Sequence, residues 1–190
     1  MTDDDYRIQE LLQREVFVNQ KRVGVIVGER YHPNEERVKS MRIQVEPDVA
    51  EEYMRKPAEY APLSKELVHS IQNDGSVKLS KSMRELQRRW RNTVRIEEQL
   101  YAPDELIDRA VLDDDGLELG VVIDLVKVKR TYRGIVVKVR SNVRRRLELE
   151  ETLNIPVTAL ARTRSRLDEI VLSRTFAKLR NLPSYLQINE

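Results

Sequence analysis

The segments "VKLSKSMREL", Val77 to Leu86, and "IVLSRTFAKL", Ile170 to Leu179, follow the same pattern. Each reads as a short apolar strand, then Leu-Ser and a basic residue, then the first turns of a helix. A match over so few residues arises easily by chance. It is therefore informative only if the segments that precede it also match.

The preceding segments match in the same order, with spacing that differs by a residue or two at expected turns. The pairs are "LLQREVFV" (Leu11–Val18) with "LIDRAVLD" (Leu106–Asp113), "RVGVIVGE" (Arg22–Glu29) with "ELGVVIDL" (Glu118–Leu125), "SMRIQVEPDV" (Ser40–Val49) with "GIVVKVRSNV" (Gly134–Val143), and "APLSKELV" (Ala61–Val68) with "IPVTALAR" (Ile155–Arg162). The last pair aligns Pro62 with Pro156. The period is longer than that of a solenoid repeat, roughly 20–50 residues, and predicts a duplicated small domain.

Alternation of apolar residues predicts strands with one buried face. In the first copy the expected buried sets are Val23, Val25 and Val27, then Met41, Ile43 and Val45. In the second copy they are Leu119, Val121 and Ile123, then Ile135, Val137 and Val139. A slip of one residue would turn each set to solvent, so the shared phase indicates two copies of one fold.

The remaining segments complete each copy. A short helical or irregular crossover is expected at 47–60, and its counterpart at 141–154. A helix follows the quoted strand, with Met83, Leu86 and Trp90 on one face and, in the second copy, Phe176 and Leu179 until Pro183. Each copy then holds five or six short strands, whose closure into a barrel would remove exposed edges. We predict a mainly β chain of two tandem small β-barrels, each with a short C-terminal helix: 8–92, a structured connector 93–104, 105–181 and a tail 182–190.

Composition excludes several classes of function. Lys and Arg total 34 and Asp and Glu total 32, which argues against a dedicated nucleic-acid binder. The chain has no cysteine, which excludes disulfides and thiolate chemistry. No apolar run is long enough to span a bilayer, and the acidic start "MTDDDY" is unlike a signal peptide. We therefore expect a cytoplasmic protein that does not insert into a membrane.

Candidate chemistry is sparse. The two histidines, His32 and His69, are interpreted as turn and surface residues. The acids of "DDDG" (Asp113–Gly116) are contiguous rather than alternating, so a turn is favoured over a calcium loop. Gly24 and Gly28 lie inside a strand and read as strand glycines that mark a close approach or a bulge, rather than a phosphate cradle. We expect no catalytic residue, no cofactor and no metal site, and a protein that is not an enzyme.

The ordered set of motifs resembles the PRC-barrel domain. In the first copy it comprises Leu11, Arg14 and Val16, then Gly24 to Gly28, Met41 to Val45, Ala61-Pro62 and Val77 to Ser80. In the second it comprises Leu106, Arg109 and Val111, then Gly120 to Asp124, Ile135 to Val139, Ile155-Pro156 and Ile170 to Ser173. The resemblance covers nearly the whole chain apart from the acidic start, the connector and the tail.

The tandem arrangement is most similar to archaeal PRC-barrel proteins of the CdpB type. That resemblance implies a non-catalytic adaptor in cell division, located at the division site, with SepF, FtsZ or another PRC-barrel protein as partner. The alternative is a ribosome- or RNA-maturation factor of the RimM kind, although RimM joins one PRC-barrel to a different barrel. A small-molecule-binding barrel is the third reading, and homo-oligomers also stay open.

Basic clusters and tyrosines supply the candidate contact residues. Arg84, Arg88 and Arg91 fall near one flank of the predicted helix, and further basic residues lie in 127–133 and 144–146. They read as a salt-bridged solvated surface, an RNA face or a dock for an acidic partner. The tail is too apolar for an idle terminus, and either packs on its own barrel or adds to a partner's edge. The candidate partner-contact residues are Tyr53, Tyr60, Arg88, Trp90, Arg91, Tyr101, Leu182, Tyr185, Leu186 and Ile188.

Overall fold

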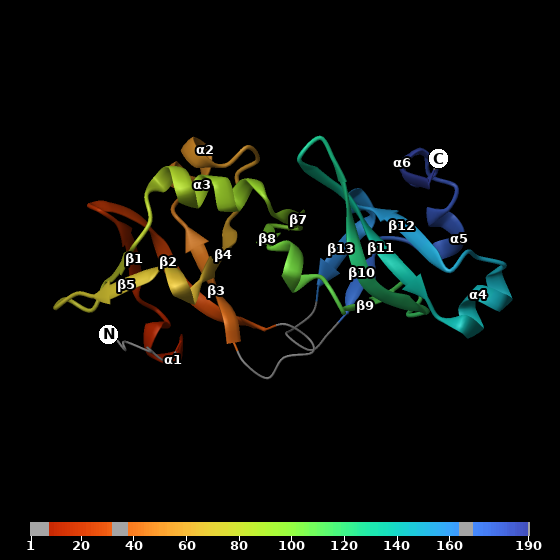
Figure 1. Cartoon of the computed structure of the whole chain (residues 1–190), viewed down its shortest axis with the longest axis horizontal. Helices are drawn as coiled ribbons and strands as arrows, with labels where there is room; N and C mark the ends of the chain where they lie inside the picture. Colours follow the sequence, from red (N-terminus) through yellow and green to blue (C-terminus); the bar gives the residue numbers. More distant parts are fainter. Residues whose placement is uncertain (1–7, 32–37, 164–168, 190) are drawn as a thin grey trace. The chain divides into compact units, whose positions relative to one another are not determined.

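The structure, a computed structural model, describes residues 8–31, 38–163 and 169–189 (Figure 1). The chain divides into two compact units. The first contains the described residues of 1–31, 35–93 and 98–102, and the second contains the described residues of 94–97 and 103–190. Each unit is built around one β-sheet, and the helices are short, so the predicted mainly β fold is confirmed.

The first unit holds a sheet in the order β5-β6-β1-β2-β3-β4-β8. Neighbours pair antiparallel except β1 with β6 and β4 with β8, which are parallel. Its elements are α1 (Ile8–Leu11), β1 (Glu15–Val18), β2 (Lys21–Tyr31), β3 (Val38–Val45), α2 (Pro47–Tyr53), β4 (Tyr60–Ser64), η1 (Lys65–Leu67), β5 (Val68–Ile71), β6 (Val77–Leu79), α3 (Met83–Arg91) and β8 (Gln99–Tyr101).

The second unit holds a sheet in the order β12-β11-β10-β9-β14-β13, and only β9 with β14 is parallel. Its elements are β7 (Val94–Ile96), η2 (Pro103–Glu105), β9 (Ala110–Leu112), β10 (Glu118–Val128), β11 (Thr131–Val139), α4 (Ser141–Leu147), β12 (Thr152–Pro156), η3 (Val157–Ala159), β13 (Leu160–Thr163), β14 (Ile170–Leu172), α5 (Phe176–Leu179) and α6 (Pro183–Asn189). From β12 to β13, this order matches the order of the first sheet from β4 to β5, as expected of a duplicated fold.

Closure into barrels is the part of the fold prediction that the strand pairing does not reproduce. Among the described strands, no pairing joins β5 to β4 or β13 to β12, so each sheet is open in its hydrogen bonding. One edge of each sheet is covered instead by the segment that follows the copy. A strand, β8, pairs with β4, and a helix, α6, packs on β12.

The duplication extends to individual backbone hydrogen bonds. The Gln13 N–H donates to the Ile26 carbonyl oxygen at 2.7 Å, and the Asp108 N–H donates to that of Val122 at 2.8 Å. Gln13 and Asp108 also share a left-handed backbone, each with φ of 64°. The arginine that follows each of them donates its Nε to the carbonyl oxygen four residues earlier. These shared details identify the two units as copies of one fold.

Two equivalent glycines allow the central strands to approach closely. A Cβ added to Gly24 would lie 2.0 Å from the carbonyl oxygen of Gln44, and one added to Gly120 would lie 2.0 Å from that of Lys138. No side chain fits at that distance, so these positions require glycine.

The predicted alternation is correct for β3 and β11 but wrong for β2 and β10. Met41, Ile43, Ile135 and Val137 are fully buried, as expected. In β2, however, the buried residues are Val23 and Ile26, whereas Val25 and Val27 are half-buried. In β10, Leu119 and Val122 are buried, Val121 is half-buried and Ile123 is 45% exposed.

β-Bulges explain this correction, because an extra residue in one strand shifts the phase of all that follow. The register against β1 and β3 skips Val23 and Val27, and the register against β9 and β11 skips Leu119 and Ile123. The bulges fall at equivalent positions, so they are a property of the duplicated fold.

The alignment of Pro62 with Pro156 is also wrong, by two residues. Pro62 pairs with Arg42 in β3, and the equivalent position of β11, Val136, pairs with Asn154. Proline is tolerated at several positions of an outer strand, so it does not fix the register. The predicted crossover helix is present in both copies as α2 and α4, and the expected helix after the quoted strand is present as α3 and α5.

Candidate interaction surfaces

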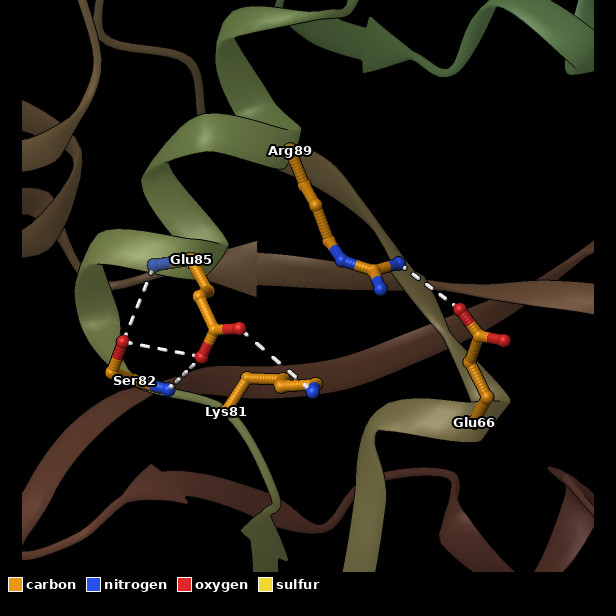
Figure 2. Close-up of polar contacts among 5 residues, drawn as sticks. All are labelled: Glu66, Lys81, Ser82, Glu85 and Arg89. Carbon is orange, nitrogen blue, oxygen red and sulfur yellow. Dashed lines mark hydrogen bonds and ion pairs between the residues drawn. The ribbon is translucent and has the colours of Figure 1, made fainter.

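The helix α3 begins with a capping box, which Figure 2 shows. The Ser82 hydroxyl accepts from the Glu85 N–H at 3.4 Å, and the Glu85 carboxylate accepts from the Ser82 N–H at 3.2 Å. That backbone hydrogen bond, with the charge of Lys81, holds the pKa of Glu85 below its usual range. The box fixes the start of the helix and thereby sets which residues face outward.

A row of three arginines occupies one exposed flank of α3. Arg84, Arg88 and Arg91 are spaced by four and three residues, which places them on one side of the helix. In the described part of the chain none of the three has an ion pair, whereas Arg89 pairs with Glu66 at 3.1 Å (Figure 2). We call Arg84, Arg88 and Arg91 the arginine row.

Trp90 lies on the opposite side of α3 and is buried at 4% exposure. Its indole Nε1 donates to the carbonyl oxygen of Pro62 at 3.3 Å. Trp90 shares this side with the buried Leu86, as the predicted helical face requires, and packs in the core of the first unit, so it is not accessible as the candidate contact residue that we expected.

Arg30 and Arg42 attach β8 to the rest of the first unit, and Arg42 does so by donating its Nη1 to the Gln99 Oε1 at 3.3 Å. The Arg30 guanidinium lies 4.4 Å from the ring centroid of Tyr101, and its Nη1 donates to the Leu100 carbonyl oxygen at 2.8 Å. The Arg42 guanidinium lies 5.2 Å from the ring centroid of Tyr60. Stacking a guanidinium on an aromatic face is favourable and fixes both groups. Tyr101 is buried as a result, and Tyr60 is half-buried.

Tyr53 belongs to a smaller contact at the end of α2. The Lys21 ammonium lies 5.1 Å from its ring centroid and donates to the Glu52 carboxylate at 2.6 Å. The hydrogen bond from Lys21 lowers the pKa of Glu52, and the hydrogen bond to Glu52 raises the pKa of Tyr53. Tyr53 is half-buried, so part of its surface stays accessible.

The tail forms α6 on the second unit, which favours the first of the two expectations for it. The Asn154 N–H donates to the Asn189 Oδ1 at 3.1 Å, and the Asn189 Nδ2 donates to the Asn154 carbonyl oxygen at 2.8 Å. Tyr185 is buried and meets Phe176 edge-on, with ring centroids 6.0 Å apart. Leu182 and Ile188 are half-buried, and Leu186 is 50% exposed.

The candidate contact residues therefore separate by burial. Trp90, Tyr101 and Tyr185 pack inside their own units, whereas Arg88, Arg91 and Leu186 are exposed. Tyr53, Tyr60, Leu182 and Ile188 are half-buried. A contact role for these seven accessible residues stays a prediction.

The β10–β11 hairpin carries a basic surface that includes none of the candidate partner-contact residues. Lys127, Lys129, Arg130 and Arg133 are all exposed near its turn, and so is Val128, at 48%. Lys129 and Arg130 form the two-residue turn, and both have positive φ. The sequence "KVKRTYR" indicates a basic surface, since its seven consecutive residues include four cations and no acid.

The Asp113 carboxylate is a buried polar group with a structural role. It accepts from the N–H groups of Asp115, Leu117 and Phe176 at 3.1, 2.9 and 3.0 Å. It thereby closes the turn at 113–116 and caps the first residue of α5, as the turn interpretation of "DDDG" requires. Within the described ranges there is no group of three or more His, Asp or Glu residues arranged to hold a metal.

A surface hollow and the two histidines are the remaining candidate features. A shallow hollow lies beside Arg14 and Gly75, and the Arg14 Nη1 donates to the Gly75 carbonyl oxygen at 2.7 Å across it. His69 is exposed in β5, as expected, and His32 lies outside the described residues. No helix in the described ranges is long and apolar enough to cross a membrane.

Comparisons with known proteins place the chain in no family. No family model matches it, and no curated protein matches it. Among solved structures, a proposed 16S ribosomal RNA processing protein, RimM, from Pseudomonas aeruginosa is 14% identical. That match covers 81% of this chain and 98% of the other, with a TM-score of 0.31. Similarity at this level establishes neither family membership nor function.

Proposed function

We propose that this chain is a non-catalytic adaptor, built from two PRC-barrel-like copies, that joins partner proteins through the differing surfaces of its two units. The observation that carries the proposal is that one fold occurs twice with different exposed chemistry. The first copy presents the arginine row on α3, and the second presents the basic hairpin of β10 and β11. Two linked sites bind a pair of partners, or two sites on one partner, more tightly than either site alone.

Cell division is the specific setting that we propose, with SepF, FtsZ or another PRC-barrel protein as the partner. This part rests on the resemblance of the tandem motifs to archaeal CdpB-type proteins. The exposed cations support an acidic partner, because complementary charge guides association and fixes orientation. We propose a cytoplasmic location, with concentration at the division site.

The test is affinity purification of the tagged full chain from its native cells, with nuclease treatment, followed by mass spectrometry. Recovery of SepF, FtsZ or a PRC-barrel protein that resists nuclease would support the adaptor. Recovery of ribosomal proteins that disappear with nuclease would overturn it.

The arginine row supports a second candidate, a ribosome- or RNA-maturation factor. Three exposed arginines on one helix flank, with no ion pair to any residue that the structure describes, suit a phosphate backbone. Binding of single-stranded RNA would then fall on replacement of Arg84, Arg88 and Arg91 by Gln. The matched control replaces Lys138, Arg162 and Lys178, which are exposed cations of the second unit outside the basic clusters, and removes the same charge. Equal RNA binding by the two triple variants would argue against a role for the row.

A further inference from the structure

The β10–β11 hairpin extends beyond the strands that flank it (Figure 1). Pairing of β10 with β9 ends at Val121, opposite Ala110, and pairing of β11 with β12 begins at Gly134, opposite Pro156. Within the described residues, the stretch from Ile123 to Arg133 is therefore a two-stranded ribbon. The outer side of β10 in this stretch has no neighbouring strand among the described ones, so an added strand can pair with its backbone. The Leu125 N–H donates to the Asp124 carboxylate at 2.7 Å, so this one group already has an acceptor.

The charge at the tip of the ribbon is of one sign, whereas the acid of the ribbon, Asp124, lies at its base beside Ile123. Residues 125–139 contain five basic side chains and no acid. Four of the five, Lys127, Lys129, Arg130 and Arg133, lie at the tip and are exposed, and none has an ion pair within the described ranges. Lys127 contacts the Tyr132 ring, with its Nζ 5.2 Å from the centroid. The tip therefore concentrates positive potential on a chain that is nearly neutral overall.

Apolar side chains are exposed on the same strand. Three large hydrophobic residues stand out as exposed among the described residues, and two of them, Ile123 and Val128, belong to β10. They flank Lys127 and lie beyond the last pair with β9. A phosphate backbone offers such side chains nothing to contact, whereas a peptide strand carries side chains that do.

We infer that the ribbon Ile123–Arg133 docks an extended acidic segment of a partner protein, which adds as a strand along the free edge of β10. Its Asp or Glu side chains meet the tip cations, and its intervening apolar side chains cover Ile123 and Val128. The inference deepens the proposed adaptor function and rests on it. It assigns to the second copy a peptide site that depends on charge, strand pairing and apolar contact together.

The experiment measures binding of a short fluorescent peptide, in which glutamate alternates with valine or threonine, by anisotropy to the purified full chain. The decisive variant is Lys129→Asn with Arg130→Gly. Asn-Gly is the preferred pair for a two-residue turn with positive φ, so this variant removes two cations and keeps the turn. We expect its Kd to rise by about 2- to 30-fold, the range that two exposed ion pairs contribute.

Two further variants separate the parts of the proposed site. Ile123→Thr with Val128→Thr keeps β-branched residues in the strand and removes the apolar contact, so binding weakens at unchanged charge. Lys138→Gln removes an exposed cation from the same strand as Arg133 but away from the tip, and should leave the Kd unchanged. Circular dichroism spectra that match the wild type would confirm that all variants fold.

Three outcomes would overturn the inference. The first is that a peptide with all its glutamates in one block and all its apolar residues in another binds as tightly as the alternating peptide. The second is that the Asn-Gly variant binds the alternating peptide as tightly as the wild type does. The third is that a single-stranded RNA of similar length binds more tightly than the peptide, and that the Asn-Gly change abolishes this RNA binding. The adaptor proposal is tested separately by using the Asn-Gly variant as bait in native cells. Unchanged capture of the partner proteins would reject the ribbon as the dock and leave the adaptor standing.

Discussion

Replacing Gly24 by alanine is the sharpest test of how the two central strands of the first unit pack. The new Cβ would lie 2.0 Å from the Gln44 carbonyl oxygen and 2.9 Å from its carbon. Carbon and oxygen approach one another to about 3.3–3.6 Å, so β2 and β3 must separate by more than about 1 Å at this point. Overpacking costs ~1–3 kcal/mol, and each weakened ladder bond adds to it, so we expect ~2–4 kcal/mol of destabilisation.

The matched control is Gly28→Ala, four residues further along the same strand. Its Cβ would make an ordinary contact, 3.7 Å from the Arg42 Nη2. The second copy already carries a side chain at the equivalent position, Asp124. An unfolded chain with alanine at this position has fewer conformations than one with glycine, so it loses less conformational entropy on folding. The variant should therefore be as stable as the wild type or more stable by up to ~1 kcal/mol.

The assay is urea unfolding followed by the fluorescence of Trp90, which is the sole tryptophan of the chain and is buried in the first unit. Gly24→Ala should move the unfolding midpoint to lower urea, and Gly28→Ala should not. Equal midpoints for the two variants would refute the close-approach argument. The equivalent change in the second copy, Gly120→Ala, should cost a similar amount when followed by far-ultraviolet circular dichroism.

Three further predictions test other contacts. Asn189→Ala should speed hydrogen exchange at the Asn154 amide and cost ~1–2 kcal/mol, because two reciprocal hydrogen bonds are lost; unchanged exchange would show that α6 does not depend on them. Asp113→Ala should destabilise the second unit by ~2–4 kcal/mol in urea unfolding, since three N–H groups lose their acceptor, and a smaller loss than Asn189→Ala would contradict this. Lys21→Met should raise the Glu52 pKa in an NMR carboxyl titration, because the hydrogen bond that lowers this pKa is removed. In the wild type the contact between Lys21 and Glu52 stabilises the fold fully above the pKa of Glu52 in the unfolded chain. That stabilisation is lost as the pH falls through the lower pKa of Glu52 in the folded protein.

The duplication and the type of most elements could be predicted from the sequence because they depend on local pattern. Alternation placed Met41 and Ile43 correctly on the buried face of β3, and the Leu-Ser-basic motif marked the start of α3. The capping box at Ser82 and Glu85 is a local feature of the same kind. Such signals lie within a few residues of one another, so one sequence is enough to read them.

The features that the sequence did not predict depend on contacts between distant segments. The bulges at Val23 and Val27 are set by pairing with β1 and β3. Gly24 and Gly28, which follow them, are typical of a bulge or a close approach but do not fix which residue the register skips. Burial of Tyr101 depends on Arg30, which is far away in the sequence. The contact residues were chosen for residue type, which does not separate a packed tyrosine from an exposed one. The exposure of Ile123 could not be predicted, because an apolar residue at an alternating strand position is typical of a buried face.

The covering of β4 by β8 bears on how the first copy can be produced as a fragment. The Tyr60 N–H donates to the Glu98 carbonyl oxygen at 3.1 Å, and β8 supplies the buried Leu100 and Tyr101. A fragment that stops at Asn92 would lack these groups, and the bare edge of β4 would invite pairing between molecules. A fragment extended to Ala102 would carry its own cover. We therefore expect a fragment of the first copy to resist aggregation only when it includes β8.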